Sequence, residues 1–593
     1  MSRQAPALLP QPRRLDLDAR RRVELRAPLE LVRAEQKVAE GYKLTIGPDG
    51  TARAEAADDA GWFYARCTLD QLVSLDPTGR VPVGVVEDWP DLPVRGVMLD
   101  VSRCKVPTLD TLYGIVDRLA SWKLNQLQLY IEHTFAYPGH EAVWAEADPF
   151  DAGDLAKLAA YCAARHVELV PNQNALGHME RWLLHHRYAA LGISRGVVAG
   201  PLGMPMAAST LDPANPGAFA LVRELLEAQC AALPGRRLHV GLDEPWDLPR
   251  ERAGEWGAWL HRLRALPAAE DRTLLVWGDM VAAHGALLGT LPEGVTVCEW
   301  GYEANHPFAS RAGALAERGV EHWLCPGTSS WLSLVGRSSN CLENCAGAAQ
   351  AAAESGATGM LVTDWGDMGH LQHLPVSDLG FAAAAALSWC RQANDHDLET
   401  YARLLDRHCY GDDAGEVGTS LVRLGDLHRR VPLQVPNISA LVLHLYFPQL
   451  PVAQLDPALT AAHLHSVGAG IEEAVTALRR ARPTTAHGRL AVDELAASGE
   501  LLGLCGVDAE ARLAAGGDLA ALSPQVRADL AARLGEMIEA HRERWLARNR
   551  PGGLDESCAW LDHLRRCYLR GEADEDWAGP LVERARAASR EEP

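Results

Sequence analysis

The chain has 593 residues, too many for a single hydrophobic core, so we expect several domains. Its formal charge of -21 argues against a nucleic-acid or anionic-membrane partner. No run of about 18 apolar residues occurs, so no membrane span is expected, and residues 1–22 lack the apolar core of a signal peptide.

The thirteen cysteines are scattered along the chain. Cys341 and Cys345 are the closest set, but no second pair accompanies them, so we expect no metal site. Free thiols are the default in a reducing compartment. Together with the missing export signal, they predict a cytoplasmic protein.

Residues 1–90 are expected to form a small α+β domain. A strand is predicted at 22–29, a hairpin at 41–57 and an amphipathic helix at 61–75. The proline-rich segment 81–92 is interpreted as a linker to the next domain.

Residues 91–395 alternate short apolar runs with amphipathic segments of helical length. Eight such repeats predict a parallel sheet that is covered by helices, and a closed (β/α)8 TIM barrel is the favoured arrangement. An open doubly wound sheet is the alternative, weakened because no glycine-rich phosphate fingerprint follows the first strand. The eight strands are predicted at 94–101, 124–131, 166–171, 237–242, 273–278, 295–300, 321–325 and 359–364.

Residues 396–593 show helical periodicity with caps and breakers between the helices. We expect a C-terminal helical domain that either packs on the barrel and closes its pocket or forms a homodimer. Segment 545–553, polar and aromatic, is expected to be a simple interhelical loop, with a contact to the active-site rim or to a partner subunit as the alternatives. Residues 583–593 are interpreted as a charged tail.

Two adjacent carboxylates, Asp243 and Glu244, end the predicted fourth strand. Neighbouring residues at a strand end point in different directions, so both can contact one ligand while their surroundings separate their pKa values. The alternative is a helix N-cap, because Asp-Glu-Pro commonly begins a helix.

Functional groups should gather at the C-terminal strand ends if the barrel is correct. A single tryptophan at one strand end would be explained by ordinary packing under a loop. Here, however, aromatic residues and carboxylates recur at several of these strand ends. Such a rim predicts a carbohydrate site, where indoles contact the sugar face and carboxylates bind its hydroxyls. The groups at these ends include Asp100, Arg103, Glu132, Asn174, His178, Trp277, Asp279, Trp300, Tyr302, Trp331, Trp365 and Asp367.

These motifs resemble glycoside hydrolase family 20, the exo-β-N-acetylhexosaminidases. The segment 239–244, His-Val-Gly-Leu-Asp-Glu, is similar to the family signature His-x-Gly-Gly-Asp-Glu. The segments 41–44, 61–69 and 95–103 also resemble the family, and the resemblance covers roughly residues 20–395. It implies a small domain followed by a (β/α)8 barrel, and a retaining mechanism assisted by the 2-acetamido group of the substrate.

The resemblance also implies roles for individual residues. Glu244 would be the general acid and base, and Asp243 would orient the acetamido group. The substrate is a terminal β-linked GlcNAc or GalNAc, and no cofactor is implied. Sugar-binding positions are implied for Arg95, Glu132, Trp277, Trp300, Trp365 and Asp367, and His178, at the same site, is expected to support the two carboxylates by hydrogen bonding unless it is a plain structural histidine. Tyr302 and Trp331, at the same rim, are further candidates for sugar binding.

The chain departs from the family pattern in three places. Leu242 replaces a glycine, and Glu132 begins a segment that differs from the family's Asp-Asp-Gln-Gly-Trp-Arg. A family tyrosine that binds the acetamido oxygen is missing near Ser329 and Ser330. Tyr302, Tyr137 or a serine hydroxyl are the candidates to replace it.

Two other functions remain open on the sequence. A barrel glycosidase could use Glu244 with Glu132 or Asp367 on a sugar that lacks the 2-acetamido group. A non-catalytic sugar-binding protein is the third alternative, and the missing tyrosine is its support.

Overall fold

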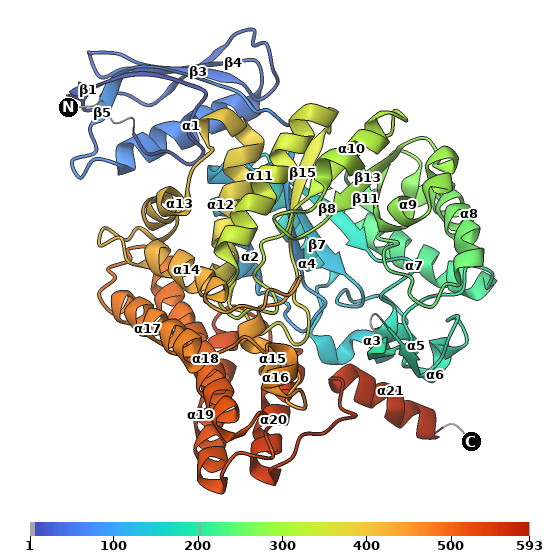
Figure 1. Ribbon diagram of the computed structural model, residues 1–593. Coiled ribbons are helices and arrows are strands. Elements are labelled where there is room, and N and C mark those ends of the chain that lie inside the picture. Colours follow the sequence, from blue (N-terminus) through green and yellow to red (C-terminus); the bar gives the residue numbers. More distant parts are fainter. Residues whose placement is uncertain (1–5, 201–202, 592–593) are drawn as a thin grey trace.

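The computed structural model describes residues 6–200 and 203–591. Its centre is a closed barrel of eight parallel strands in the order β11-β12-β13-β14-β15-β6-β7-β8, which confirms the predicted (β/α)8 fold and excludes the open sheet (Figure 1). All eight predicted strands are present. They are β6 (Val94–Asp100), β7 (Gln126–Ile131), β8 (Glu168–Gln173), β11 (Arg237–His239), β12 (Thr273–Trp277), β13 (Val295–Trp300), β14 (His322–Cys325) and β15 (Gly359–Asp364).

Successive side chains along each barrel strand point alternately into two apolar environments, one outside and one inside the barrel. Outward side chains such as Val97 and Leu99 pack with the surrounding helices in the largest core. Inward side chains such as Met98, Cys298 and Trp323 form a second, internal cluster. Because both faces are buried, the strands read as continuous apolar runs. The covering helices include α2 (Leu109–Ser121), α4 (Ala152–Ala163), α7 (Pro216–Ala232), α8 (Ala253–Arg264), α10 (Phe308–Ala316), α11 (Ser338–Ser355) and α12 (Asp378–Cys390).

The N-terminal domain is a five-stranded sheet in the order β1-β5-β3-β4-β2, with helix α1 (Asp59–Ser74) packed on it (Figure 1). The hairpin prediction is confirmed by β3 (Tyr42–Ile46) and β4 (Ala52–Ala56). The linker prediction at 81–92 is wrong, because β5 (Val81–Asp88) pairs with both β1 and β3.

The strand predicted at 22–29 is wrong beyond Val23, because the first strand is β1 (Arg14–Val23) and residues 24–29 lie outside any strand, before a short β2 (Glu30–Arg33). Pro82 stands at the second position of β5, opposite Arg22, where the register with β1 is irregular. A proline is tolerated near the start of a strand. The alternating charged residues of β1 lie on an exposed sheet edge, which explains the weak apolar pattern of this segment.

Helices fill the chain from Leu398 onward, as predicted. The expected charged tail is instead helix α21 (Pro580–Glu591), which contacts the short strands β9 (Val197–Ala199) and β10 (Pro205–Ala207) of a separate two-stranded sheet. The other helices are α13 (Leu398–Leu405), α14 (Val417–Gly425), α15 (Leu443–Tyr446), α16 (Val452–Leu455), α17 (Ala461–Leu478), α18 (Ala486–Ala515), α19 (Pro524–Leu546) and α20 (Leu554–Arg570).

The turn between α19 and α20 docks on the loop that follows β6. The carbonyl of Arg548 accepts a hydrogen bond from the Thr108 amide at 2.9 Å, and Asn549 forms a bridge with Pro107. The Arg548 side chain makes a two-pronged ion pair with Glu494, at 2.6 and 2.7 Å, and both side chains are buried. The turn is therefore a contact to the barrel. The domain limits at residues 90 and 395 stay predictions, because one core runs from the barrel into the helices.

All thirteen cysteines are free thiols. Among the described residues, every helix is too short or too polar to cross a membrane.

Candidate active site

The carboxylate pair lies in an irregular segment directly after β11. Gly241, Leu242 and Glu244 all have left-handed backbone angles, with φ of 69°, 71° and 48°. The next helical turn begins only at Arg250, so Asp243 does not cap a helix. A left-handed leucine costs about 1–2 kcal/mol. This cost is offset because the Leu242 side chain is fully buried and its carbonyl accepts a hydrogen bond from Trp256 at 2.8 Å.

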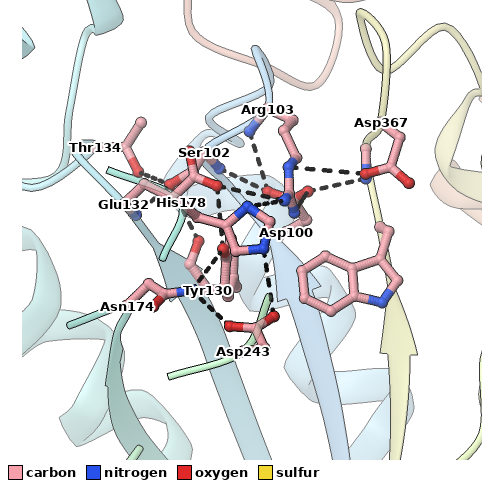
Figure 2. A network of polar contacts seen from close by, with 12 residues as sticks. Asp100, Ser102, Arg103, Tyr130, Glu132, Thr134, Asn174, His178, Asp243 and Asp367 are labelled. Atoms are coloured by element: carbon pink, nitrogen blue, oxygen red, sulfur yellow. Dashed lines mark hydrogen bonds and ion pairs between the residues drawn. The ribbon is translucent and has the colours of Figure 1, made fainter. Parts of the chain in front are cut away.

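Asp243 is surrounded by donors. Asn174 donates to its Oδ1 at 2.8 Å, and His178 Nε2 lies 3.5 Å from its Oδ2 (Figure 2). Burial raises the pKa of Asp243, but His178 and the two hydrogen bonds outweigh it, so the net shift is downward. Asp243 is therefore held as the carboxylate.

His178 bridges the two carboxylates, since its Nε2 also lies 3.5 Å from Glu244 Oε2. Burial lowers the pKa of His178, whereas Asp243 and Glu244 raise it well above the ordinary value. Glu244 is the more accessible partner, with 28% of its side chain exposed against 7% for Asp243. The geometry gives one fixed, ionised carboxylate and one accessible carboxyl.

Arg103 stands at the centre of the polar network in Figure 2. Its guanidinium lies 3.1 Å from Asp100, 3.5 Å from Glu132 and 3.7 Å from Asp367. Burial raises the pKa of Glu132 to about 7 despite Arg103, and burial also raises that of Asp367. The arrangement places cationic donors and carboxyl groups together, which suits the paired hydroxyls of a sugar.

Arg95 lies elsewhere. It is the second residue of β6, so it stands at the opposite end of the barrel from the carboxylate pair. Its guanidinium is fully buried and contacts Glu40 at 2.6 Å and the carbonyl of Lys123 at 2.8 Å. The expectation that Arg95 binds the sugar is corrected: Arg95 joins the N-terminal domain to the base of the barrel, and Arg103 is the arginine of the site.

The predicted aromatic residues gather over the mouth of the barrel. Trp277, Trp331 and Trp365 are buried, whereas Trp300 and Tyr302 are half-buried. Trp300 stacks on Tyr302 with centroids 5.2 Å apart, and the Trp365 indole donates to the Tyr302 hydroxyl at 2.9 Å. The five rings belong to one internal cluster.

Two candidates for the missing tyrosine are excluded by their contacts. The hydroxyl of Tyr137 is buried against Gln173 and Gln229 on the outer side of the barrel. Ser330 donates to Asp364 at 2.7 Å, and Ser329 is buried against Asn340 of α11, with 1% of the residue exposed. Tyr302 is left as the hydroxyl that lies within the aromatic cluster.

Three residues of the site were named at strand ends in the sequence but were given no role. Arg103, Asn174 and Asp279 follow β6, β8 and β12, where a barrel carries its functional groups. The position of each after a strand was the available signal, and it would also have favoured Arg103 over Arg95.

Asn174→Ala is expected to lower kcat/KM about tenfold to a hundredfold, because a charge-assisted hydrogen bond of about 1.5–3 kcal/mol to Asp243 is lost. Steady-state kinetics measure the change. Asn172 provides the control, since its amide donates to Gln128 rather than to a catalytic carboxylate. Equal losses in Asn172→Ala and Asn174→Ala would show a purely structural effect.

Asp279 lies beside the pair, where its Oδ2 accepts from the Glu244 amide at 3.1 Å. Burial, together with the charge of Asp243, raises the pKa of Asp279 to about 7. The folded state therefore resists ionisation that the unfolded chain undergoes near pH 4, and stability is lost as pH rises from about 4 to about 7.

Asp279→Asn is expected to remove this pH-dependent loss. The melting temperature of the variant should gain roughly 2–4 °C on the wild type between pH 5 and pH 8, as measured by differential scanning calorimetry. Asp271, which is exposed, supplies a matched Asp→Asn control. A constant difference across this pH range would contradict the raised pKa.

Two sequence models of one family match the chain. The "Glycosyl hydrolase family 20, catalytic domain" matches residues 92–355, and "Glycosyl hydrolase family 20, domain 2" matches residues 5–89. Together they cover more than half of the chain.

Individual relatives agree with these matches. A beta-hexosaminidase from Akkermansia muciniphila is 31% identical over 207 residues, which are 31% of this chain and 40% of that protein. A beta-hexosaminidase from Vibrio furnissii is 23% identical over 282 residues, which are 41% of this chain and 43% of that protein. The chain thus spans less than half the length of these curated relatives.

The fold agrees as well. The structure of a family 20 β-N-acetylhexosaminidase from Streptomyces coelicolor A3(2) aligns with a TM-score of 0.51 at 24% identity, over 66% of this chain and 84% of that chain. The two family models, in the order of the N-terminal sheet and the barrel described above, show that the chain belongs to glycoside hydrolase family 20.

Proposed function

We propose that the protein is an exo-acting β-N-acetylhexosaminidase, which removes terminal β-linked GlcNAc or GalNAc by a retaining, substrate-assisted mechanism. The observation that carries the proposal is the Asp243–Glu244 pair, in which Asn174 and His178 hold Asp243 ionised while Glu244 stays accessible.

In the first step, the acetamido oxygen of the substrate attacks the anomeric carbon as the glycosidic bond breaks. Glu244 donates its proton to the leaving oxygen, and Asp243 accepts the acetamido N–H and stabilises the developing oxazolinium cation. Water then attacks the anomeric carbon, Glu244 takes its proton, and the acetamido group re-forms. Because the acetamido oxygen is the nucleophile, no carboxylate of the protein has to attack the anomeric carbon. The mechanism is in this respect an exception to the usual glycosidase scheme with two catalytic carboxylates.

The network around Arg103 is proposed to bind the hydroxyls at the non-reducing end of the sugar. Arg103 supplies donors, while Glu132 and Asp367 supply acceptors within 4 Å of it. His178 acts on the carboxylates and not on the sugar, because its Nε2 faces both of them.

Tyr302 is proposed to replace the missing family tyrosine. Burial raises its pKa well above the ordinary value, so the hydroxyl keeps its proton. Because that hydroxyl already accepts from Trp365, its own O–H is available to donate to the acetamido oxygen. Trp277, Trp300, Trp331 and Trp365 complete the apolar surroundings of the acetamido methyl.

A cytoplasmic location is proposed on the thirteen free thiols, which fit a reducing compartment. A homodimer is a further proposal that rests on the extra helical region.

Two substrates and one inhibitor test the proposed function. The protein is expected to hydrolyse aryl β-GlcNAc or β-GalNAc glycosides, to leave the corresponding β-glucosides intact, and to be inhibited by N-acetylglucosamine thiazoline, which resembles the oxazolinium intermediate. Turnover of the β-glucoside without inhibition by the thiazoline would favour the two-carboxylate glycosidase, and no turnover would favour the sugar-binding protein.

A further inference from the structure

The loop that follows β15, residues 365–372, carries Trp365 and Asp367 at the sugar site and then turns back; we call it the β15 loop. Left-handed backbone is unfavourable for residues that have a Cβ atom, so a loop that contains it needs outside contacts. Three consecutive residues of the β15 loop have φ of 52°, 92° and 50°, namely Met368, Gly369 and His370.

One side chain closes the β15 loop at its base. The Gln372 side-chain amide donates to the carbonyl of Trp365 at 2.7 Å, so the two ends of the loop are joined. Gln372 is buried, which strengthens this hydrogen bond relative to one in water. The Trp365 indole in turn donates to the hydroxyl of Tyr302 at 2.9 Å. The place of Trp365 in the site therefore depends on Gln372.

A second loop is tied to the same point. Lys105 lies two residues after Arg103 in the loop that follows β6, and its ammonium donates to the carbonyl of Gln372. The Lys105 side chain is buried and lies over the Trp545 ring of α19, 5.4 Å from the ring centroid. The two loops thus meet twice: at the Lys105–Gln372 hydrogen bond, and in the site, where Arg103 lies 3.7 Å from Asp367 (Figure 2).

The C-terminal helices hold the outer side of the β15 loop. Leu371 is buried in the core cluster that contains Trp545 and Trp560, and Met368 packs against this cluster. Gly369 lies so close to Trp560 of α20 that there is no room for a Cβ atom between them. The β15 loop therefore has one side at the sugar site and the other in the helical core.

We propose that Gln372 is a positioning residue of the sugar site, which acts through Trp365 and Asp367, and that Lys105 and the C-terminal helices hold it in place. This inference rests on the proposed function, because the position of the β15 loop matters only if the loop binds the sugar. The loop and the helices lie beyond residues 5–89 and 92–355, which the family models match. The helical region thereby gains a role in hydrolysis.

Gln372→Met keeps the approximate length of the side chain and removes its amide donor. The variant is expected to lower kcat/KM on an aryl β-N-acetylhexosaminide about fivefold, the value of one hydrogen bond, because the backbone of Trp365 is released. Gln71→Met is the matched control, since the Gln71 amide also donates to backbone carbonyls, those of Leu9 and Ser121, but lies in the N-terminal domain. The control should keep wild-type kinetics.

A double-mutant cycle separates positioning from a general loss of structure. In the Asp367→Ala background, the β15 loop has lost its sugar-binding carboxylate, so Gln372→Met is expected to lower kcat/KM only about twofold. A merely structural role would give the same fivefold loss in both backgrounds. Lys105→Met is the second variant, and it is expected to lower kcat/KM about fivefold as well. Combined with Gln372→Met, it should add little, because both variants release one loop.

Wild-type kinetics in Gln372→Met, or equal losses in the two backgrounds, would overturn the positioning role and leave the proposed function intact. If Gln372→Met does not fold, Lys105→Met decides through the same two comparisons. Absence of turnover by the wild type on aryl β-N-acetylhexosaminides overturns the proposed function and the positioning role together.

Discussion

Glu244→Gln is expected to lower kcat/KM on N,N'-diacetylchitobiose by a factor of about 10²–10⁴, the usual contribution of a general acid. The amide has nearly the same shape but has no acidic proton to give to the leaving oxygen. Steady-state hydrolysis of the disaccharide, with folding checked by circular dichroism, measures the effect.

N-Acetyl-β-glucosaminyl fluoride provides an internal comparison, because its leaving group, the fluoride ion, departs with little need for a proton. We expect Glu244→Gln to lose less activity on the fluoride than on the disaccharide. Glu293→Gln, at an exposed position, should behave as the wild type. Wild-type rates in Glu244→Gln on the disaccharide would remove Glu244 from the mechanism.

Arg548→Met is expected to lower the free energy of unfolding by about 3–5 kcal/mol, because Glu494 is left buried without its partner. The side chains of the pair are 8% and 4% exposed. Urea denaturation followed by circular dichroism measures the loss.

A matched pair makes this prediction specific, because Asp493 precedes Glu494 on α18 and is paired with Arg544 of α19. Arg544 binds Asp493 with equally short contacts of 2.7 and 2.9 Å, but Asp493 is 61% exposed. Arg544→Met is expected to cost about 0–1 kcal/mol, as for other exposed ion pairs. Similar losses of unfolding free energy in the two variants would show that burial of the Arg548–Glu494 pair does not determine how much the pair contributes to stability.

The barrel could be predicted because its strands are buried on both faces, which leaves an apolar run in the sequence wherever a strand occurs. The same reasoning failed at β5. Pro82 and neighbouring prolines suggested a linker, but a proline near the start of a strand loses little pairing.

The site was predictable where residue type and strand end coincided, as for Asp243 and Glu244. Arg95 was misplaced because one arginine lies at the start of β6 and another, Arg103, follows the strand, and the sugar-binding role was assigned to the first of them. The sequence offered Tyr302, Tyr137 and the serines as candidates for the missing tyrosine. The proposal of Tyr302 among them depends on the hydrogen bond from Trp365, which the sequence does not reveal.

Leu242 also ties the direction of the two carboxylates to the packing of the barrel. Its backbone has a left-handed φ of 71°, and its side chain is part of the largest core cluster. Leu242→Gly would relieve about 1–2 kcal/mol of strain but leave a cavity whose cost for a leucine is about 2–5 kcal/mol. The core therefore anchors the strained segment that carries Asp243 and Glu244, and loosening of the core at this point would also displace the two carboxylates.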